Sequence, residues 1–329
     1  MSAAILHAQT NNIAQSIAAD VAAVNLVIRQ RLHSEVSLVN QIAEYIISAG
    51  GKRIRPTLVL LVANAYGYKG TAHHELAAVV EFIHTATLLH DDVVDESSMR
   101  RGRKTANALF GNAASVLVGD FLYSRSFQMM VGLSNMRVMQ ILSDATNVIA
   151  EGEVLQLLNM HDPDVSEQAY LNVIRSKTAK LFEAAAQLGA LISGAGDTDI
   201  VAAGEYGRSL GTAFQLIDDV LDYAGDAEAI GKNVGDDLRE GKPTLPLIYL
   251  MENGTPEQCA LVRNCIEQGD EQHFDAILAA ITTSGALDYT RRAAEVAAKR
   301  AAGAIAGLPD SEYKQSLLQL CVFAVDRNH

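Results

Sequence analysis

Apolar residues recur at spacings of three and four along most of this chain of 329 residues. Such a period places them on one face of a helix, whereas a half-buried strand needs strict alternation, which we do not find between turn signals. Only 6 prolines interrupt the chain, and they lie near the ends of the periodic segments. We therefore expect an all-α protein whose helices include residues 13–32, 76–95, 116–130, 138–158, 170–192, 202–223, 245–251 and 289–305.

The breaks between these segments are short, and no low-complexity linker divides the chain. Length alone would suggest about two domains. The longest segments are apolar over most of their surface, which is typical of the central helices of a bundle. Hydrophobic residues make up 49% of the chain, enough for a large core. We expect residues 1–329 to form one domain, a single large helical bundle around a central active-site cavity.

The overall charge of −13 argues against a general nucleic-acid-binding protein, whose surface is usually basic. The three cysteines, Cys259, Cys265 and Cys321, have no C-x-x-C spacing, so neither a disulfide framework nor a zinc site is indicated. We see no signal peptide and no apolar run of about 18 residues that could cross a membrane. A cytoplasmic location, in a reducing compartment, fits these features.

Two acidic clusters of the form D-D-x-x-D lie at the ends of apolar helical segments. Their members are Asp91, Asp92 and Asp95 in the first cluster, and Asp218, Asp219 and Asp222 in the second. The outer two aspartates of each cluster share a helix face, where like charges repel. Oxygen-only ligands suit a hard cation such as Mg²⁺, which completes its shell with water and phosphate oxygens. One such cluster is more often a solvated helix end, but two copies make that interpretation unlikely.

Basic residues stand where an anionic ligand would need them. The loop GGKRIRP at 50–56 carries three cations before an expected helix start, a position that favours phosphate. The run RRGRK at 100–104 follows the first acidic cluster, and Lys232 and Lys242 follow the second. The alternatives are an exposed basic loop at 50–56 and simple charge balance at 100–104.

His84 and Gln215 lie on the helix faces that carry the aspartates, one or two turns earlier. Both can therefore face the same cavity, although His84 could equally be a hydrogen-bonded core histidine. Glu81-x-x-His84 also matches half of the di-iron bundle motif. That class needs a second pair, which we do not find, so the di-iron interpretation is weak.

Seven ordered motifs of this chain resemble those of the trans-prenyl diphosphate synthase family over essentially its whole length. They are GGKRIRP (50–56), HTATLLHDDVVDESSMRRG (84–102), GDFLYSRSF (119–127), EGEVLQL (151–157), SKTAKLFEAA (176–185), GTAFQLIDDVLDYAGD (211–226) and GKNVGDDLREGKPTLPL (231–247). The resemblance implies the isoprenoid synthase fold and repeated condensation of isopentenyl diphosphate with an allylic diphosphate. It is greatest to the bacterial long-chain members that make octaprenyl diphosphate for the side chain of respiratory quinones.

The resemblance also implies a role for each site residue. Three Mg²⁺ ions would bridge the two clusters to the allylic diphosphate, with Asp91, Asp95 and Asp218 as direct ligands and Asp92, Asp219 and Asp222 as further ligands or orienters of water. The allylic diphosphate would be held by Arg100, Lys177 and Lys232, with Lys242 in a family motif of less certain role. Thr178 and Gln215 would lie near the allylic cation, and isopentenyl diphosphate would be held by Lys52, Arg55, His84 and Arg101.

A growing hydrocarbon needs an apolar tunnel, and the helix that carries Asp91 should form one wall of it. Each turn back from the aspartates descends about 5.4 Å, roughly one isoprene unit, which places Thr87 almost directly below Asp91. Ala86 is also small, but its assignment rests on the family resemblance. Met129 or Met130 is a candidate for the tunnel floor, although ordinary core packing is the preferred interpretation of either methionine taken singly.

Two other functions remain open at this stage. A class I terpene cyclase also uses D-D-x-x-D and Mg²⁺, but it pairs this motif with an N-x-x-x-[ST]-x-x-x-E cluster and holds no second diphosphate. A non-catalytic subunit of a heteromeric prenyl synthase would have lost aspartates, and all six are present here. The resemblance further implies a homodimer that pairs through the apolar helix 116–130, with transient membrane contact as a possible route of product release.

Overall fold

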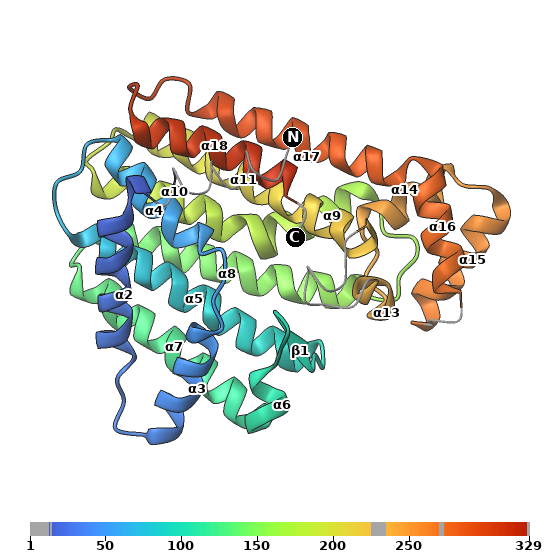
Figure 1. The fold of residues 1–329 in the computed structure, drawn as a ribbon, viewed down its shortest axis with the longest axis horizontal. Coiled ribbons are helices and arrows are strands. Elements are labelled where there is room, and N and C mark those ends of the chain that lie inside the picture. The colour runs from blue at the N-terminus through green and yellow to red at the C-terminus, as the bar shows by residue number, and fades with distance from the viewer. Residues whose placement is uncertain (1–12, 14, 225–234, 270–272, 328–329) are drawn as a thin grey trace.

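A computed structural model describes residues 13, 15–224, 235–269 and 273–327 of the chain. Figure 1 shows that helices dominate this structure, as the periodicity predicts. Their bounds are α2 (Ala18–Leu32), α3 (Ser37–Ser48), α4 (Ile54–Ala65), α5 (Ala72–Val94), α6 (Ala106–Phe110), α7 (Asn112–Gly132), α8 (Met136–Asn159), α9 (Glu167–Ile174), the π-helical turn η1 (Arg175–Ala179), α10 (Lys180–Ile192), α11 (Asp197–Ala224), α13 (Asp236–Arg239), α14 (Leu245–Asn253), α15 (Pro256–Gln268), α16 (Phe274–Ser284), α17 (Ala286–Ala304) and α18 (Glu312–Asp326).

Every segment expected from the three- and four-residue spacing is largely helical. The periodic segments omit α3, α4, α6, α13, α15, α16 and α18, although the loop at 50–56 indicated a helix start where α4 begins. Helix α4 shows why, because nearly all of its side chains are buried and such a helix has no polar face to make a period visible. A local signal does mark α15, since Thr255 and Gln258 form a capping box around Pro256 at the helix start.

The described residues include one pair of short strands, β1 (Met99–Arg100) and β2 (Arg103–Lys104), which the sequence did not predict. They form an antiparallel hairpin directly after the first acidic cluster. Its two-residue turn, Arg101 and Gly102, has φ of 52° and 70°. Two consecutive positive φ values are typical of a tight hairpin turn. The residue before this turn, Arg100, pairs with Asp92 of α5.

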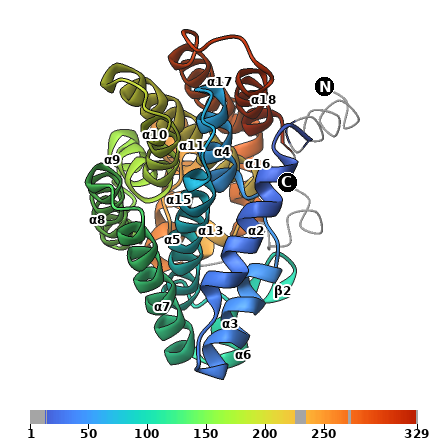
Figure 2. The same cartoon turned by 90° about the vertical axis from the view of Figure 1, so that its left-hand side faces the viewer.

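The main hydrophobic core lies among α2, α4, α5, α7, α10, α11 and α18. Helix α10 contacts both α5 and α11, so the two helices that end in acidic clusters flank it. Figures 1 and 2 show these long helices running through the body of the molecule, with α13–α16 gathered at one end. The core thereby holds the C-terminal ends of α5 and α11 on the same side of the bundle.

Helix α8 approaches η1 closely because residue 152 is a glycine. A Cβ atom at this position would lie 2.7 Å from the backbone nitrogen of Lys177. The π-helical turn at Arg175–Ala179 interrupts the helical run of α9 and α10, and turns of this kind often occur at functional sites. The glycine contact and the extra residue of the turn together fix the position of Lys177 and Thr178.

In the part of the chain that the structure describes, no helix is both long enough and apolar enough to cross a membrane.

Candidate active site

The first acidic cluster occupies the last turn of α5, where its members meet different environments. Asp92 is fully buried and accepts a hydrogen bond from Arg100 Nε at 2.7 Å. Asp91 and Asp95 are partly exposed, and each faces a lysine: Lys177 Nζ lies 3.8 Å from Asp91 Oδ2, and Lys242 Nζ lies 3.1 Å from Asp95 Oδ1. The expected pairing of Asp91 and Asp95 on one side of the helix is therefore present.

The second cluster lies near the end of α11 and is also divided. Asp219 is buried, with the Tyr170 hydroxyl and Gln215 Nε2 as its hydrogen-bond donors. Asp218 is the more exposed member and pairs with Arg327 Nη1 at 2.6 Å. Asp222 Oδ2 accepts a hydrogen bond of 3.3 Å from a backbone N–H. The outer aspartates again face cations or donors, while the middle one is anchored in the protein.

A cavity of about 80 Å³ lies beside the second cluster and is lined by the two lysines that face Asp91 and Asp95. It brings together five of the residues predicted for the site, which are Lys177, Thr178, Gln215, Asp219 and Lys242. Thr178 Oγ1 donates to Gln215 Oε1 at 3.0 Å, and Gln215 in turn donates to Asp219, so a hydrogen-bonded chain links η1 to α11. The rest of the polar lining is Gln156, Asn159, Tyr170, Asp237 and Thr244.

Lys177 is the centre of a small charge network. Its Nζ lies 2.5 Å from Glu153 Oε2 and donates to Gln156 Oε1 at 2.6 Å, in addition to its approach to Asp91. Burial raises the pKa of Glu153 to about 7, against the opposing effect of Lys177. In the sequence, Glu153 and Gln156 belong to the motif EGEVLQL, but no periodic pattern of charged residues marked either one as a site residue.

Burial also raises the pKa of the aspartates nearest to the cavity. The pKa of Asp91 rises because of its burial, while Lys177 lowers it and Asp95 raises it further. Burial shifts the pKa of Asp219 well above its usual range, and the charge of Asp237 adds to the shift. Carboxyl groups in such surroundings gain most from a cation, and the all-oxygen donor set fits a hard divalent ion.

The residues predicted to bind isopentenyl diphosphate gather on the other side of Asp218. Arg55 Nη1 lies 3.1 Å from His84 Nε2, and its guanidinium lies over the Phe182 ring. Lys52 Nζ lies 5.6 Å from the centre of the Phe214 ring. Burial and the neighbouring charge of Arg55 hold the pKa of His84 well below its usual range.

Two arginines of the hairpin, predicted to hold diphosphate groups, have partners within the protein in this structure. Arg101 donates to the backbone carbonyl of Gly50, so it supports the loop that carries Lys52 and Arg55. Arg100 is paired with the buried Asp92 and is not among the residues that line the cavity. Lys232 lies outside the described residues.

Arg327 is a site residue that sequence reasoning missed. Its side chain is almost fully buried, lies 3.7 Å from the Phe214 ring centre and pairs with Asp218. It lies more than 100 positions from Asp218 in the sequence, next to the end of the chain, where no motif indicated a function. Only the packing of α18 against α11 brings it to the site.

The four residues predicted to control product length lie away from the cavity. Ala86, Met129 and Met130 belong to the main hydrophobic core between α5 and α7. Thr87 is partly exposed, and its hydroxyl donates to the His84 carbonyl at 2.8 Å. These placements are compatible with a tunnel wall and with ordinary packing, so the length-control role of these residues stays a prediction.

Comparison with known proteins identifies the family. The polyprenyl synthetase family model matches residues 36–281. Octaprenyl diphosphate synthase of Escherichia coli is 56% identical over 94% of this chain and 97% of its own length, and the geranyl-diphosphate-specific all-trans-nonaprenyl-diphosphate synthase of Rhodobacter capsulatus is 46% identical over 96% and 97%. A polyprenyl synthase from Caulobacter crescentus, solved with calcium and isoprenyl diphosphate, superposes with a TM-score of 0.94 at 44% identity and covers 97% of this chain and 98% of its own.

These relatives share the helical bundle described above, and they match it across nearly its full length. The resemblance stated from the seven motifs is therefore confirmed, and this chain belongs to the polyprenyl synthetase family.

Proposed function

We propose that this chain is a long-chain trans-prenyl diphosphate synthase, a prenyltransferase that adds isopentenyl diphosphate units repeatedly to an allylic diphosphate. The primer would be farnesyl diphosphate and the product about octaprenyl diphosphate, for the side chain of a quinone such as ubiquinone. The observation that carries this proposal is that both acidic clusters are linked to one cavity, the second through Asp219 and the first through the paired lysines Lys177 and Lys242. The identity to an octaprenyl diphosphate synthase supports the chain length.

The metal would be Mg²⁺, with three ions present when substrate is bound. Asp91, Asp95 and Asp218 are the proposed direct ligands, since each is partly exposed and already faces a cationic side chain that an ion could replace. The buried Asp92 and Asp219, together with Asp222, would orient these ligands or bound water. When bound, Mg²⁺ neutralises the charge that builds on the departing diphosphate. The calcium in the Caulobacter relative supports a divalent-cation site in this family.

The allylic diphosphate would bind at the cavity side of the clusters. Lys177 and Lys242 reach this side as point charges. Burial disfavours the charge on Lys242, yet the carboxylates of Asp237 and Asp95 outweigh it and raise the pKa of this lysine. Arg100 and Lys232 remain predicted partners of the same diphosphate. Gln215 and Thr178 present polar atoms of the hydrogen-bonded chain towards the position of the allylic cation.

Isopentenyl diphosphate would bind beside Asp218, where the loop before α4 meets the C-terminal segment. Lys52, Arg55, His84 and Arg101 are its predicted partners, and Arg327 is a fifth candidate on the same side. Arginine can grip phosphate oxygens through two N–H groups, which suits a diphosphate. The two substrates would then meet between α5 and α11, so that the double bond of one attacks the allylic cation of the other. The proton lost in this step would pass to the departed diphosphate.

The alternatives fit less well. A terpene cyclase has no use for the cluster of Arg55, His84 and Lys52 on the far side of Asp218. A non-catalytic subunit has no need for six aspartates in two intact clusters. The remaining parts of the proposal are a homodimer, a cytoplasmic location, transient contact with a membrane for product release and no nucleic-acid partner.

The test is turnover by the isolated chain, given farnesyl diphosphate, isopentenyl diphosphate and Mg²⁺. We expect chromatography of the products to show a ladder that ends near the octaprenyl length, and released diphosphate in proportion to the units added. A cyclic hydrocarbon made from farnesyl diphosphate alone would support the cyclase instead. A chain that turns over only after a second protein is added would support the subunit.

A further inference from the structure

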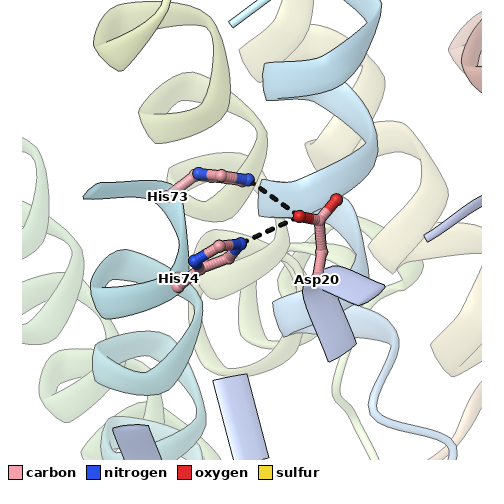
Figure 3. Close-up of side chains that lie close together, drawn as sticks. All are labelled: Asp20, His73 and His74. Atoms are coloured by element: carbon pink, nitrogen blue, oxygen red, sulfur yellow. Dashed lines mark hydrogen bonds and ion pairs between the residues drawn. The ribbon is translucent and has the colours of Figure 1, made fainter. Parts of the chain in front are cut away.

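Asp20, His73 and His74 form a cluster at the end of the bundle opposite to the acidic clusters. Asp20 lies in α2, and the two histidines lie in the first turn of α5. Figure 3 shows both imidazole rings pointing at the same oxygen of the aspartate. The distances from Asp20 Oδ1 are 3.3 Å to His73 Nε2 and 2.8 Å to His74 Nε2. None of the three residues contributes to the proposed active site.

The convergence of two adjacent histidines is unusual for a helix. Consecutive residues diverge by about 100° around a helix axis, so their side chains normally point to different neighbours. Here the ring centres lie only 4.0 Å apart, and both rings turn towards α2. A shared partner explains this arrangement. In the structure that partner is a single carboxylate oxygen, which both imidazoles approach at once.

The spacing of the donor atoms fits a small divalent ion. The three ligand atoms all lie within 4.8 Å of one another. Zinc binds imidazole nitrogen and carboxylate oxygen at about 2.0–2.2 Å, which for a tetrahedral site separates ligands by about 3.3–3.6 Å. The 3.3 Å pair already has this separation, and the 2.8 Å pair needs to open by only about half an ångström.

The surroundings hold the carboxylate in place. Asn64 Nδ2 of α4 donates to the second oxygen, Asp20 Oδ2, at 2.7 Å, so Oδ1 stays directed at the rings.

We propose that Asp20, His73 and His74 bind one Zn²⁺ ion, which clamps α2 to the start of α5. Two nitrogen donors and one oxygen donor select zinc and similar transition metals over Mg²⁺, which prefers oxygen ligands. The fourth position is open to water, because Asp20 and His74 are partly exposed. Along α5 the site lies about 27 Å from Asp91, so its role is structural and separate from the proposed magnesium sites.

The experiment uses the full chain without an affinity tag, in excess Mg²⁺ so that the acidic clusters are already supplied with cations. Zinc is added, free metal is removed by equilibrium dialysis, and bound metal is measured by elemental analysis. We expect one equivalent of bound Zn²⁺ and a rise in Tm that Mg²⁺ alone does not produce.

His74→Gln and Asp20→Asn are the test variants, since both side chains are partly exposed and both replacements keep hydrogen-bonding capacity. We expect each to weaken Zn²⁺ binding on the order of tenfold or more, and to abolish the rise in Tm. His33→Gln is the matched control, because His33 is exposed in the loop after α2 and should leave binding unchanged. Turnover with Mg²⁺ should be the same in all of these proteins and serves as the check of folding.

Wild-type protein that binds no zinc, or variants that bind it as well as the wild type, would overturn the proposal and leave the cluster as a hydrogen-bonded tie between helices. If the variants do not fold, Co²⁺ supplies a readout on the wild type alone. A visible absorption band typical of four-coordinate Co²⁺ with nitrogen and oxygen ligands is expected in excess Mg²⁺, and its absence would equally overturn the proposal.

Discussion

Asp91 and Asp92 are neighbours in one motif, yet the protein uses them in different ways. Asp91 is partly exposed and faces the ammonium group of Lys177, whereas Asp92 is fully buried against Arg100. The sequence predicted both as members of a metal-binding cluster, but it could not separate them, because the difference comes from a hairpin that folds Arg100 back onto α5. The motif therefore combines a partly exposed position, which we propose as a metal ligand, with a buried anchoring position.

This division predicts different outcomes for two substitutions. Asp91→Ala should lower kcat by roughly two or more orders of magnitude with Tm almost unchanged, since it removes an electrostatic stabiliser and relieves repulsion from Asp95. Asp92→Ala should lower the free energy of unfolding as well, by about 2–3 kcal/mol, because it leaves the partly exposed Arg100 without its carboxylate. Steady-state kinetics and thermal unfolding measure the two effects. Near-normal turnover of Asp91→Ala with Mg²⁺ would contradict the metal assignment.

Arg55→Ala should raise the KM for isopentenyl diphosphate far more than the KM for the allylic substrate. Its guanidinium lies with His84 on one side of the site, away from the cavity that holds Lys177 and Lys242. Initial rates at varied concentrations of each substrate separate the two constants. Equal increases in both would mean that the loop before α4 is structural or that the two sites are coupled.

His84 should make the protein less stable as the pH falls from about 6.5. Its pKa is depressed in the folded state, so the unfolded chain takes up a proton in this range while the folded chain does not. Stability is therefore present above the unfolded pKa and decreases below it. Thermal unfolding between pH 8 and pH 5 should give a flatter profile for His84→Gln than for the wild type. Parallel profiles would show that His84 does not titrate in this way.

At the scale of elements, periodicity predicted the amphipathic helices and failed for those without a polar face. Helices α7, α8 and α11 were visible because each carries several exposed residues, while α4 was not, because it is buried almost all round. The π-helical turn η1 could not be predicted from the sequence either, because its amino-acid composition does not differ from that of the α-helices on both sides of it. Its position depends on the glycine contact with α8, which is a property of two elements and not of one.

Helix α5 also carries the prediction for product length. Thr87→Phe should shorten the product, because Thr87 lies within about 40° of Asp91 around the helix and one turn deeper. The first condensation should keep a similar rate, since the residues of the diphosphate sites are unchanged. Chromatography of the products measures the chain length, and single-turnover rates measure the first step.

Ala86→Tyr is the companion variant, on a buried position that faces the core. A steric block there should act on late condensations if the growing chain passes between α5 and α7, where Met129 and Met130 also lie. Products of full length from both variants would place the tunnel along other helices.

For the whole molecule, we expect a homodimer. Helix α7 leaves Leu117 and Val131 about two-thirds exposed, and α8 exposes Val154 and Leu158 in the same way. Exposed apolar side chains gathered on helices are commonly covered by a second copy. Light scattering at micromolar concentration should give twice the mass of the chain, and Leu117→Glu should lower it. A wild-type monomer under these conditions would contradict the expectation.

The long-range part of the site was beyond sequence reasoning for a physical reason. Local patterns report which residues share a helix face, and this was enough to group Gln215 with the second cluster. They do not report which distant segment closes the site, and so Arg327 and Tyr170 went unnoticed until α18 and α9 were in place. That residues 1–329 form a single domain stays a prediction as well.

The carboxylates of the acidic clusters are already paired with basic side chains of the same chain. These are Lys177, Lys242, Arg100 and Arg327. Many metal-dependent domains cannot fold until the metal joins their ligands. Here ammonium and guanidinium groups already balance the carboxylates, so the native structure is complete before any cation arrives from solution. The supply of magnesium would then govern how fast the protein works, and not how long it survives.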